Sequence, residues 1–374
     1  MKPPTLTVRV PGKLFIAGEY AVLEPGGHSV VVAIDRYVYA HLTDSPEFVV
    51  NLHQIGFSKI SWSETDDGLR FCKYAPKLTF IQNAITVCHQ YIRHVGIQVE
   101  PFSLSIDSEL DDFATGKKYG LGSSAAVVVA VISAILQKHH AHGIPLSHEV
   151  IYKLAAIAHF TTQGSGSCAD IAASTYGGWL HYRTFDANWL IEQLEDGVDV
   201  HTLVAKQWPG LQVKTIQPPA DLELVVGWTG SEMSTVKMID RIRALQTQRP
   251  HRYAAFIDQS TEAVLSMVKH FSANNLAGAL QSLTANRKAL KALSEEVDAV
   301  IETPSLQALI QIANEYGAGK TSGAGGGDCG IALVSEKSFV DSLKREWRQA
   351  GIEPLNLTVC MEGTKRIEKG DLIV

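Results

Sequence analysis

Three glycine-rich turns are the parts of this sequence whose residue types could hold an anion. They are PGKLFIAGEY (residues 11–20), YGLGSSAA (119–126) and SGAGGGDCG (322–330). Glycine lets backbone N–H groups approach an anion closely, because no Cβ intervenes. Where a helix follows the turn, its first N–H groups and the positive end of its dipole add to the attraction. The three turns are therefore candidate phosphate-binding sites.

The second turn also carries two hydroxyl groups, on Ser123 and Ser124. These hydroxyls could bind a phosphate oxygen or Mg²⁺. Serine in front of a helix is also common simply because it caps the helix, and both interpretations stay open at this point. The turn matches neither of the familiar nucleotide motifs, since G-x-x-x-x-G-K-[ST] is absent and no G-x-G-x-x-G lies in a βαβ unit.

Regular elements that could position the turns follow from the apolar spacing. Strand patterns precede and follow the first turn, at residues 6–10 and 29–42. An apolar helix is expected directly after the second turn, over 123–138. Further expected helices and strands cover residues 78–95, 102–106, 148–162, 170–176, 179–183, 222–228, 234–245, 251–270, 277–293, 304–316, 331–334, 337–349 and 355–360.

The order of these elements predicts the fold class and the domains. Strands and helices are mixed rather than regularly alternating, which favours an α+β fold. A chain of 374 residues suggests two domains. Residues 186–220 show no clear period and contain three prolines, so we expect them to connect the domains. We place an N-terminal domain with the first two turns at 1–200 and a C-terminal domain with the third at 201–374.

Composition narrows the partners and the compartment. A formal net charge of -6 and a pI near 6.2 give no broad attraction to nucleic acid or to an anionic membrane. The five cysteines are scattered and form no C-x-x-C pair, which favours a reducing cytoplasm. The longest apolar run, residues 125–136, is typical of a core helix. We expect small-molecule partners and a monomer or homodimer.

In this order and at these positions, the three turns resemble the three signature motifs of the GHMP kinase superfamily. The matching segments are PGKLFIAGEYAVL, GLGSSAA and SGAGGGDCGIAL, which span residues 11–333. The resemblance implies a two-domain fold with an N-terminal mixed α/β kinase domain and a C-terminal ferredoxin-like α+β domain. It also implies ATP as co-substrate and Mg²⁺ as cofactor.

The same resemblance implies roles for individual residues. The second motif would surround the ATP phosphates, with either Ser123 or Ser124 binding Mg²⁺. Lys13 and Asp170 match the catalytic lysine and aspartate of the mevalonate-type members. A carboxylate near the acceptor can take its proton, and a lysine stabilises charge on the transferred phosphoryl group. The alternatives are a solvated lysine at the end of a strand for Lys13 and a simple helix cap for Asp170. The implied ATP-phosphate-binding residues are Gly120, Leu121, Gly122, Ser123, Ser124 and Ala125.

One departure from the pattern bears on the acceptor. Mevalonate kinases carry a glutamate, a second Mg²⁺ ligand, on the helix before the aspartate. Residues 150–169 contain no carboxylate here, and His159 falls roughly where the glutamate would be. Mg²⁺ prefers oxygen ligands, so we expect His159 to pack in the core. This argues against an ordinary mevalonate kinase.

Extra positive charge points to an acceptor that already bears a phosphate. Lys117 and Lys118 stand beside the second turn, and Asp328 in the third motif resembles the bacterial phosphomevalonate kinase branch of the superfamily. Two solvent-facing lysines in a turn are the alternative. The implied activity is phosphoryl transfer from ATP to 5-phosphomevalonate. The expected acceptor-binding residues are Glu19, Tyr20, Lys117, Lys118, Ser234, Thr235, Ser322, Gly323, Gly325, Gly326 and Asp328.

Other activities remain open at the level of sequence. They are mevalonate kinase, diphosphomevalonate decarboxylase and a non-catalytic ligand sensor of the same fold. The hydroxyls of Ser234 and Thr235 could equally cap the helix that begins there.

Overall fold

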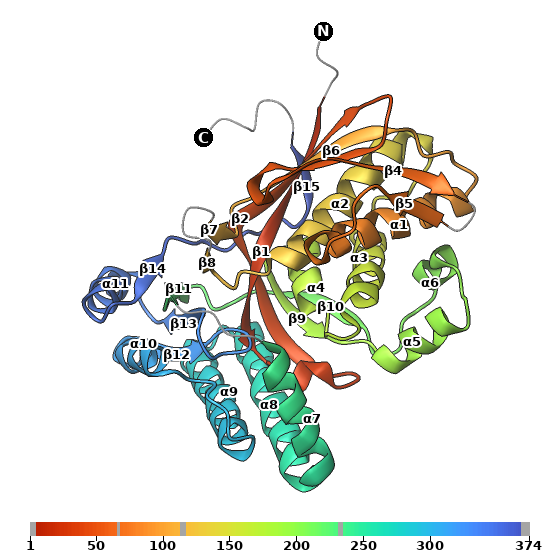
Figure 1. Ribbon diagram of the computed structural model, residues 1–374. Coiled ribbons are helices and arrows are strands. Elements are labelled where there is room, and N and C mark those ends of the chain that lie inside the picture. The colour runs from red at the N-terminus through yellow and green to blue at the C-terminus, as the bar shows by residue number, and fades with distance from the viewer. Residues whose placement is uncertain (1–4, 66–67, 113–116, 231–234, 368–374) are drawn as a thin grey trace.

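Two long antiparallel strands run through both halves of the molecule (Figure 1). The computed structural model describes residues 5–65, 68–112, 117–230 and 235–367. Strand β1 (Leu6–Ala17) pairs along its whole length with β2 (His28–Asp44), and both continue from the larger sheet down to the helices of the C-terminal half. The first segment predicted as a turn, residues 11–20, is therefore part of strand β1 up to Ala17, and it lies between the two halves of the protein.

Strand β1 is longer than the sequence pattern predicts. The predicted strand ends near Pro11 and Gly12, whereas β1 continues to Ala17. The β1–β2 register shifts between Pro11 and Gly12 and again between Phe15 and Ala17. These irregularities accommodate a proline and a glycine without ending the strand.

Within the described residues, the larger sheet has nine strands. Its order is β10-β9-β2-β6-β3-β4-β5, with β1 paired to both β2 and β15. The further strands are β3 (Val49–Leu52), β4 (Phe57–Thr65), β5 (Gly68–Phe71), β6 (Phe102–Ser108), β9 (Trp179–Arg183), β10 (Gln212–Ile216) and β15 (Lys365–Ile367). A small separate ribbon, β7 (Asp111–Asp112) and β8 (Lys117–Lys118), precedes the second turn.

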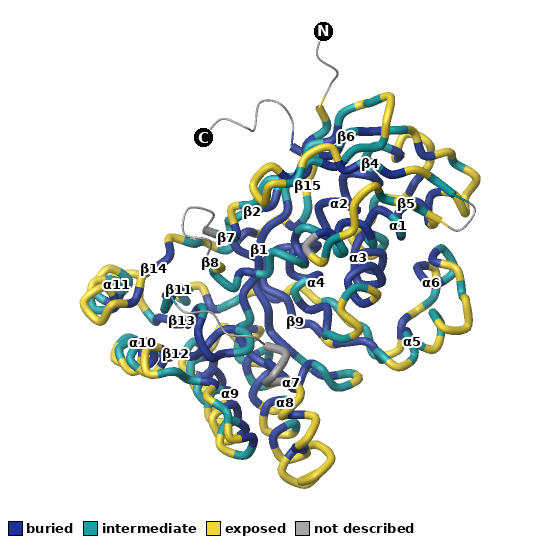
Figure 2. The backbone as a smooth tube through the Cα atoms, in the orientation of Figure 1, coloured by how far each residue is buried: buried dark blue, intermediate teal, exposed yellow. Residues whose placement is uncertain are grey.

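Helices of the first half pack against one another beside this sheet (Figure 1). They are α1 (Thr79–His94), α2 (Ser123–His139), α3 (His148–Gln163) and α4 (Ala169–Tyr176). Both α2 and α4 contact β1 and β2. By length and composition, Ser123–His142 could cross a membrane, but 67% of its apolar window is buried inside the protein. Figure 2 shows α2 buried along most of its length, as expected for the core helix predicted there.

The segment expected to connect the domains is more structured than predicted. It contains α5 (Ala187–Glu195), α6 (Val200–Ala205) and the edge strand β10. Asp186 and Asp199 cap the two helices through their carboxylates, and both helices are too short to show a clear period. Because β10 and β15 complete the larger sheet, residues beyond 200 contribute to the first core. The boundary between residues 200 and 201 stays a prediction.

The second half is a ferredoxin-like α+β unit, as the fold-class prediction states. Its four-stranded antiparallel sheet has the order β12-β13-β11-β14, which is the strand order of a βαββαβ arrangement. The strands are β11 (Glu223–Trp228), β12 (Gly317–Thr321), β13 (Cys329–Val334) and β14 (Glu353–Leu355), and the helices are α7 (Thr235–Gln248), α8 (Pro250–Ser272), α9 (Leu276–Glu296), α10 (Pro304–Asn314) and α11 (Val340–Gln349).

The strand predicted over residues 355–360 ends early. Beyond Leu355 the chain forms an isolated bridge between Val359 and Ile34. The carboxylate of Asp35 accepts hydrogen bonds from the N–H and the hydroxyl of Thr358. The alternating apolar residues therefore run beside the middle of β2, next to residues 33–35, instead of extending the second sheet.

Candidate active site

Lys13 joins the first glycine-rich turn to the second. Its N–H donates to the Leu121 carbonyl at 2.9 Å, and its Nζ donates to the Gly120 carbonyl at 3.1 Å. The residue is only 8% exposed. Gly122 makes room for it, since φ is 83° there and an added Cβ would lie 2.8 Å from Cγ of Lys13. A glycine is therefore required both by the backbone and by the lysine.

The two serines of the second turn are the first residues of α2. The N-cap position belongs to Gly122, which makes no side-chain cap, so capping by a serine is wrong as an explanation of these residues. Both serines are half-buried, and neither hydroxyl has a hydrogen-bond partner among the described residues. The first N–H groups of a helix also lack partners within it. Donors and hydroxyls are therefore available beside Lys13, while Ala125 behind them is fully buried.

The third turn lies directly against the second. Asp328 has a left-handed backbone, with φ at 52°, and an added Cβ on Gly120 would lie 2.9 Å from its Oδ2. The Cys329 thiol donates to the Tyr119 carbonyl at 3.1 Å. Burial raises the pKa of this thiol, and the charge of Asp328 raises it further, whereas Lys13 lowers it. Asp328 and Lys13 are thus close enough to act on one buried group.

A buried ion pair ties the first turn to the third. Nζ of Lys320 lies 2.5 Å from Oε1 of Glu19, and the two residues are 0% and 3% exposed. The same Oε1 accepts the N–H of Gly323 at 3.2 Å, and Nζ of Lys320 also donates to the Thr321 carbonyl at 2.7 Å. Burial lowers the pKa of Lys320 and the Glu19 carboxylate opposes this. Glu19 therefore faces Lys320, while its Oε2 is buried and has no hydrogen-bond partner among the described residues.

Two further side chains of the predicted acceptor set connect the same turns. Ser322 Oγ accepts the Phe15 N–H at 3.1 Å and donates to the Phe15 carbonyl at 2.9 Å. The Tyr20 hydroxyl donates to the Ala324 carbonyl, and burial raises the pKa of that hydroxyl. The first turn is thus hydrogen-bonded to the third turn at three places.

Glycines let the third turn take this shape. Gly323, Gly325 and Gly326 all have a left-handed backbone, with φ between 73° and 80°. An added Cβ on Gly325 would lie 2.6 Å from the Ile301 carbonyl oxygen, and the Gly326 N–H donates to the same carbonyl at 2.7 Å. Together the three turns form one connected assembly between the two halves of the protein.

Comparison with known proteins identifies this assembly. The GHMP kinases N terminal domain matches residues 80–178, and the GHMP kinases C terminal domain matches 273–353. Phosphomevalonate kinase from Streptomyces sp. (strain CL190) is 33% identical over 96% of this chain and 98% of its own length. The chain belongs to the GHMP kinase family.

Two solved structures share the fold of this chain. A Lin0012 protein from Listeria innocua has a TM-score of 0.91 and 35% identity, covering 98% of this chain and 100% of that one. Streptococcus pneumoniae phosphomevalonate kinase in complex with phosphomevalonate and AMPPNP has a TM-score of 0.80 and 27% identity, with 96% and 99% covered. Both matches extend over the two halves described above.

Asp170 lies on the first turn of α4, a helix that packs against β1. The N-cap of α4 is Cys168, in a left-handed conformation, so Asp170 is not the capping residue. Its Oδ1 accepts the Ile171 N–H at 3.0 Å, and it forms no ion pair with any residue that the structure describes. Asp170 is half-buried and lies at the positive end of the helix dipole.

Some of the lysines and hydroxyl residues predicted to bind the acceptor lie outside the described part of the chain. In the β7–β8 ribbon, Lys118 is directly opposite Asp111 and its side chain is exposed. The side chains of Lys117 and Thr235 are outside what the structure describes, and Ser234 lies outside the described residues altogether. Their roles stay predictions.

His159 packs in the core, as expected. It is 4% exposed, and its ring lies 5.0 Å from that of Phe80, at an angle of 36°. Neither ring nitrogen has a hydrogen-bond partner in the described part of the chain. A buried imidazole beside an aromatic ring is a structural residue rather than a replacement for a carboxylate ligand.

Sequence reasoning missed two buried residues that support the turns. Lys320 pairs with Glu19, as described above. Asn286 is fully buried on α9, where its Oδ1 accepts the Gly18 N–H at 3.4 Å and its Nδ2 donates to Ser260 Oγ at 3.1 Å. A lysine just ahead of the third motif and an asparagine within a long helix carry no sequence signal of such partners.

One group elsewhere has the side-chain types of a metal site. Ligand atoms of His94, Asp199 and His201 lie within 4.8 Å of one another. The two imidazoles stack with centroids 4.5 Å apart, and Nδ1 of His94 lies 3.2 Å from Oδ1 of Asp199, which caps α6. Stacking, ion pairing and capping account for this geometry, and none of the three residues belongs to the glycine-rich turns.

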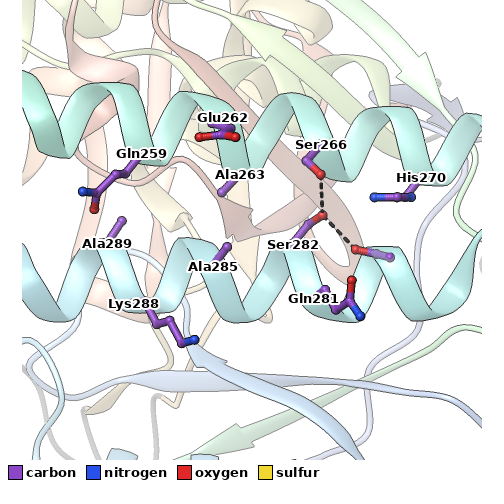
Figure 3. Close-up of a pocket in the computed structure, with 11 residues that line it drawn as sticks. Gln259, Glu262, Ala263, Ser266, His270, Gln281, Ser282, Ala285, Lys288 and Ala289 are labelled. Atoms are coloured by element: carbon purple, nitrogen blue, oxygen red, sulfur yellow. Dashed lines mark hydrogen bonds between the residues drawn. The ribbon is translucent and has the colours of Figure 1, made fainter.

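A hollow on the C-terminal half lies between α8 and α9 (Figure 3). Ser282 donates to Ser266 across it, and Glu262, His270 and Lys288 also line it. None of the residues lining this hollow was predicted for the site. It is separate from the assembly of the three turns.

Proposed function

We propose that this chain is a phosphomevalonate kinase. It would transfer the γ-phosphoryl group of ATP to 5-phosphomevalonate, giving ADP and 5-diphosphomevalonate on the mevalonate pathway to isopentenyl diphosphate. The observation that carries the proposal is the 33% identity to the Streptomyces phosphomevalonate kinase over nearly all of both chains. The structural match to the Streptococcus pneumoniae enzyme, whose complex contains phosphomevalonate and AMPPNP, supports it.

The second turn would hold the ATP phosphates. Residues 120–125 offer glycine backbone N–H groups, the first N–H groups of α2 and the Ser123 and Ser124 hydroxyls. All of these are donors suited to phosphate oxygens, and the dipole of α2 favours negative charge there. The side chain of Leu121 is buried, and its carbonyl accepts the Lys13 N–H. The group that Leu121 would offer to a phosphate is therefore its backbone N–H.

Two kinds of side chain proposed for the site fit Mg²⁺. The hydroxyl of Ser123 or Ser124, which has no partner among the described residues, and the carboxylate of Asp170 are oxygen donors, which Mg²⁺ prefers alongside phosphates and water. When bound, Mg²⁺ would neutralise charge on the ATP phosphates and on the group in transfer. The side chains then have to position the two substrates.

Lys13 and Asp170 would act at the reacting groups. The buried ammonium of Lys13 has two protons left after its bond to Gly120, and these could stabilise charge on the transferred phosphoryl group. The acceptor is itself a phosphate and is largely ionised near neutral pH. Asp170 would therefore contribute by positioning and charge at least as much as by taking a proton.

The acceptor would lie between the second and third turns. Asp328, Gly323, Gly325 and Gly326 shape that side, and Lys117, Lys118, Ser234 and Thr235 remain the proposed contacts to the acceptor's anionic groups. The bonds made by Glu19, Tyr20 and Ser322 support a role for them in holding the acceptor side together from behind. This differs from the direct contact that the family resemblance implies.

The setting we propose is cytoplasmic, with small molecules as the only partners and a monomer or homodimer as the assembly. All five cysteines are free, which suits a reducing compartment. The pI near 6.2 supports the absence of nucleic-acid and membrane partners.

The test is ADP release by the purified protein with Mg-ATP. Phosphomevalonate, mevalonate and diphosphomevalonate are each supplied as second substrate, and Asp170→Asn serves as the impaired variant. We expect turnover with phosphomevalonate alone and about 10²-fold slower turnover by the variant. Mevalonate kinase is the second candidate, because mevalonate kinase from Pyrococcus abyssi is 27% identical over 98% of this chain. Turnover of mevalonate instead would replace the proposal by that activity.

A further inference from the structure

Arg36 lies beside the second turn, and none of the roles above uses it. It is a half-buried residue of β2, and its guanidinium carbon lies 4.8 Å from the centre of the Tyr119 ring. Tyr119 immediately precedes Gly120, and its ring meets Trp228 edge-on at 5.1 Å. Stacking on an aromatic ring orients a planar guanidinium and leaves its N–H edge available.

Charged groups of the site surround the same place. Arg36 and Lys13 both lower the pKa of the buried Cys329 thiol, against the opposing effects of burial and Asp328. The two cations therefore lie close to one thiol, at the junction of the second and third turns. Positive charge at this junction is what two phosphate-bearing substrates would need.

No described carboxylate pairs with Arg36. Asp35 accepts two hydrogen bonds from Thr358, Glu109 accepts the Tyr37 N–H, and Asp328 lies against Gly120 at the same junction. Arg9, on the adjacent strand, provides the contrast. It also lies over a tyrosine, at 4.6 Å from the Tyr37 ring centre, but it forms an ion pair with Glu362.

We propose that Arg36 is a substrate-binding residue that holds a phosphate group of ATP or of the phosphorylated acceptor through its guanidinium edge. The proposal rests on the proposed function, because it assumes that two phosphate-bearing substrates meet at this junction. A guanidinium that lies over an aromatic ring and pairs with no described carboxylate is suited to bidentate binding of phosphate. Arg36 would thus provide a second positive charge beside Lys13, and its planar guanidinium would bind phosphate in one fixed orientation.

The test measures binding separately from turnover. Calorimetric titrations with AMPPNP alone and with phosphomevalonate alone would compare the wild-type protein with Arg36→Met, Arg36→Lys and the matched control Arg9→Met. We expect Arg36→Met to lower the affinity for one of the two ligands by about tenfold or more, because a charge-assisted hydrogen bond is lost. Arg36→Lys should recover part of the loss, and Arg9→Met should bind as the wild type does.

The ligand whose affinity falls identifies the phosphate that Arg36 binds, that of ATP or that of the acceptor. Unchanged affinity for both ligands in Arg36→Met, or equal losses in Arg36→Met and Arg9→Met, would overturn the proposal. If Arg36→Met does not fold, Arg36→Lys decides, since wild-type affinity in that variant excludes a need for the guanidinium. Failure of the proposed function is separate, because a protein that turns over only mevalonate can still lose AMPPNP affinity with Arg36→Met.

Discussion

At the scale of single residues, the second turn depends on a glycine, Gly122, which has no Cβ. Gly122 has φ at 83°, and an added Cβ would lie 2.8 Å from Cγ of Lys13. An alanine there would carry the strain of a left-handed backbone, about 1 kcal/mol, and would also displace the lysine. The first effect lowers stability and the second changes chemistry, so the two can be separated by a suitable control.

Gly143 supplies that control. It has φ at 96° with no atom within 4 Å of an added Cβ. We expect Gly122→Ala and Gly143→Ala to lose similar stability in thermal unfolding, while only Gly122→Ala loses kcat, by about tenfold or more, as expected when a charged group at the reacting phosphate is displaced. Equal turnover in the two variants would show that Lys13 does not need its present place over the turn.

At the scale of elements, the Glu19–Lys320 pair joins the segment just after β1 to strand β12. Both partners are nearly inaccessible to solvent, so removing one leaves an uncompensated buried charge or dipole. Breaking such a pair typically costs about 3–5 kcal/mol, whereas replacing both partners with neutral groups costs less. We therefore expect Glu19→Gln to destabilise the protein strongly and the double variant Glu19→Gln, Lys320→Met to regain part of that loss.

Denaturant unfolding of the wild type, both single variants and the double variant measures this coupling. Lys153→Met is the control, because Lys153 is also buried but pairs with the exposed Glu149 and with two carbonyls. Combining Lys153→Met with Glu19→Gln should give additive losses. If the losses from Glu19→Gln and Lys320→Met were also additive, the ion pair would not hold the segment after β1 to β12.

What the sequence could predict follows from how local each feature is. The helix after the second turn, the α+β class and the roles assigned to the turns depend on residues close together in the chain. The bond from Lys13 to Gly120 and the pairing of Glu19 with Lys320 join positions more than 100 residues apart. Arg36 likewise has no local pattern, because its significance comes from lying over Tyr119.

At the scale of the whole molecule, a cluster of bases in the larger sheet should make the fold sensitive to acid. His181 on β9 is 8% exposed, and its Nε2 lies 2.9 Å from Nδ1 of His28 on β2. Burial, then His28, Lys214 and Arg183, lower the pKa of His181 from 6.5 to about 4. The groups that act on His181 are thus basic. Protonation of its buried ring is opposed both by burial and by repulsion from these groups.

The sign of the effect on stability follows from this shift. Between pH 6.5 and about 4 the unfolded chain takes up a proton at His181 that the folded protein does not. The free energy of unfolding should therefore fall as the pH falls through this window. Unfolding midpoints measured across it should fall less steeply for His181→Gln than for the wild type, while the exposed His53→Gln should follow the wild type. Parallel curves for all three proteins would place the acid sensitivity elsewhere, because His181 would then bind its proton equally well in the folded and unfolded protein.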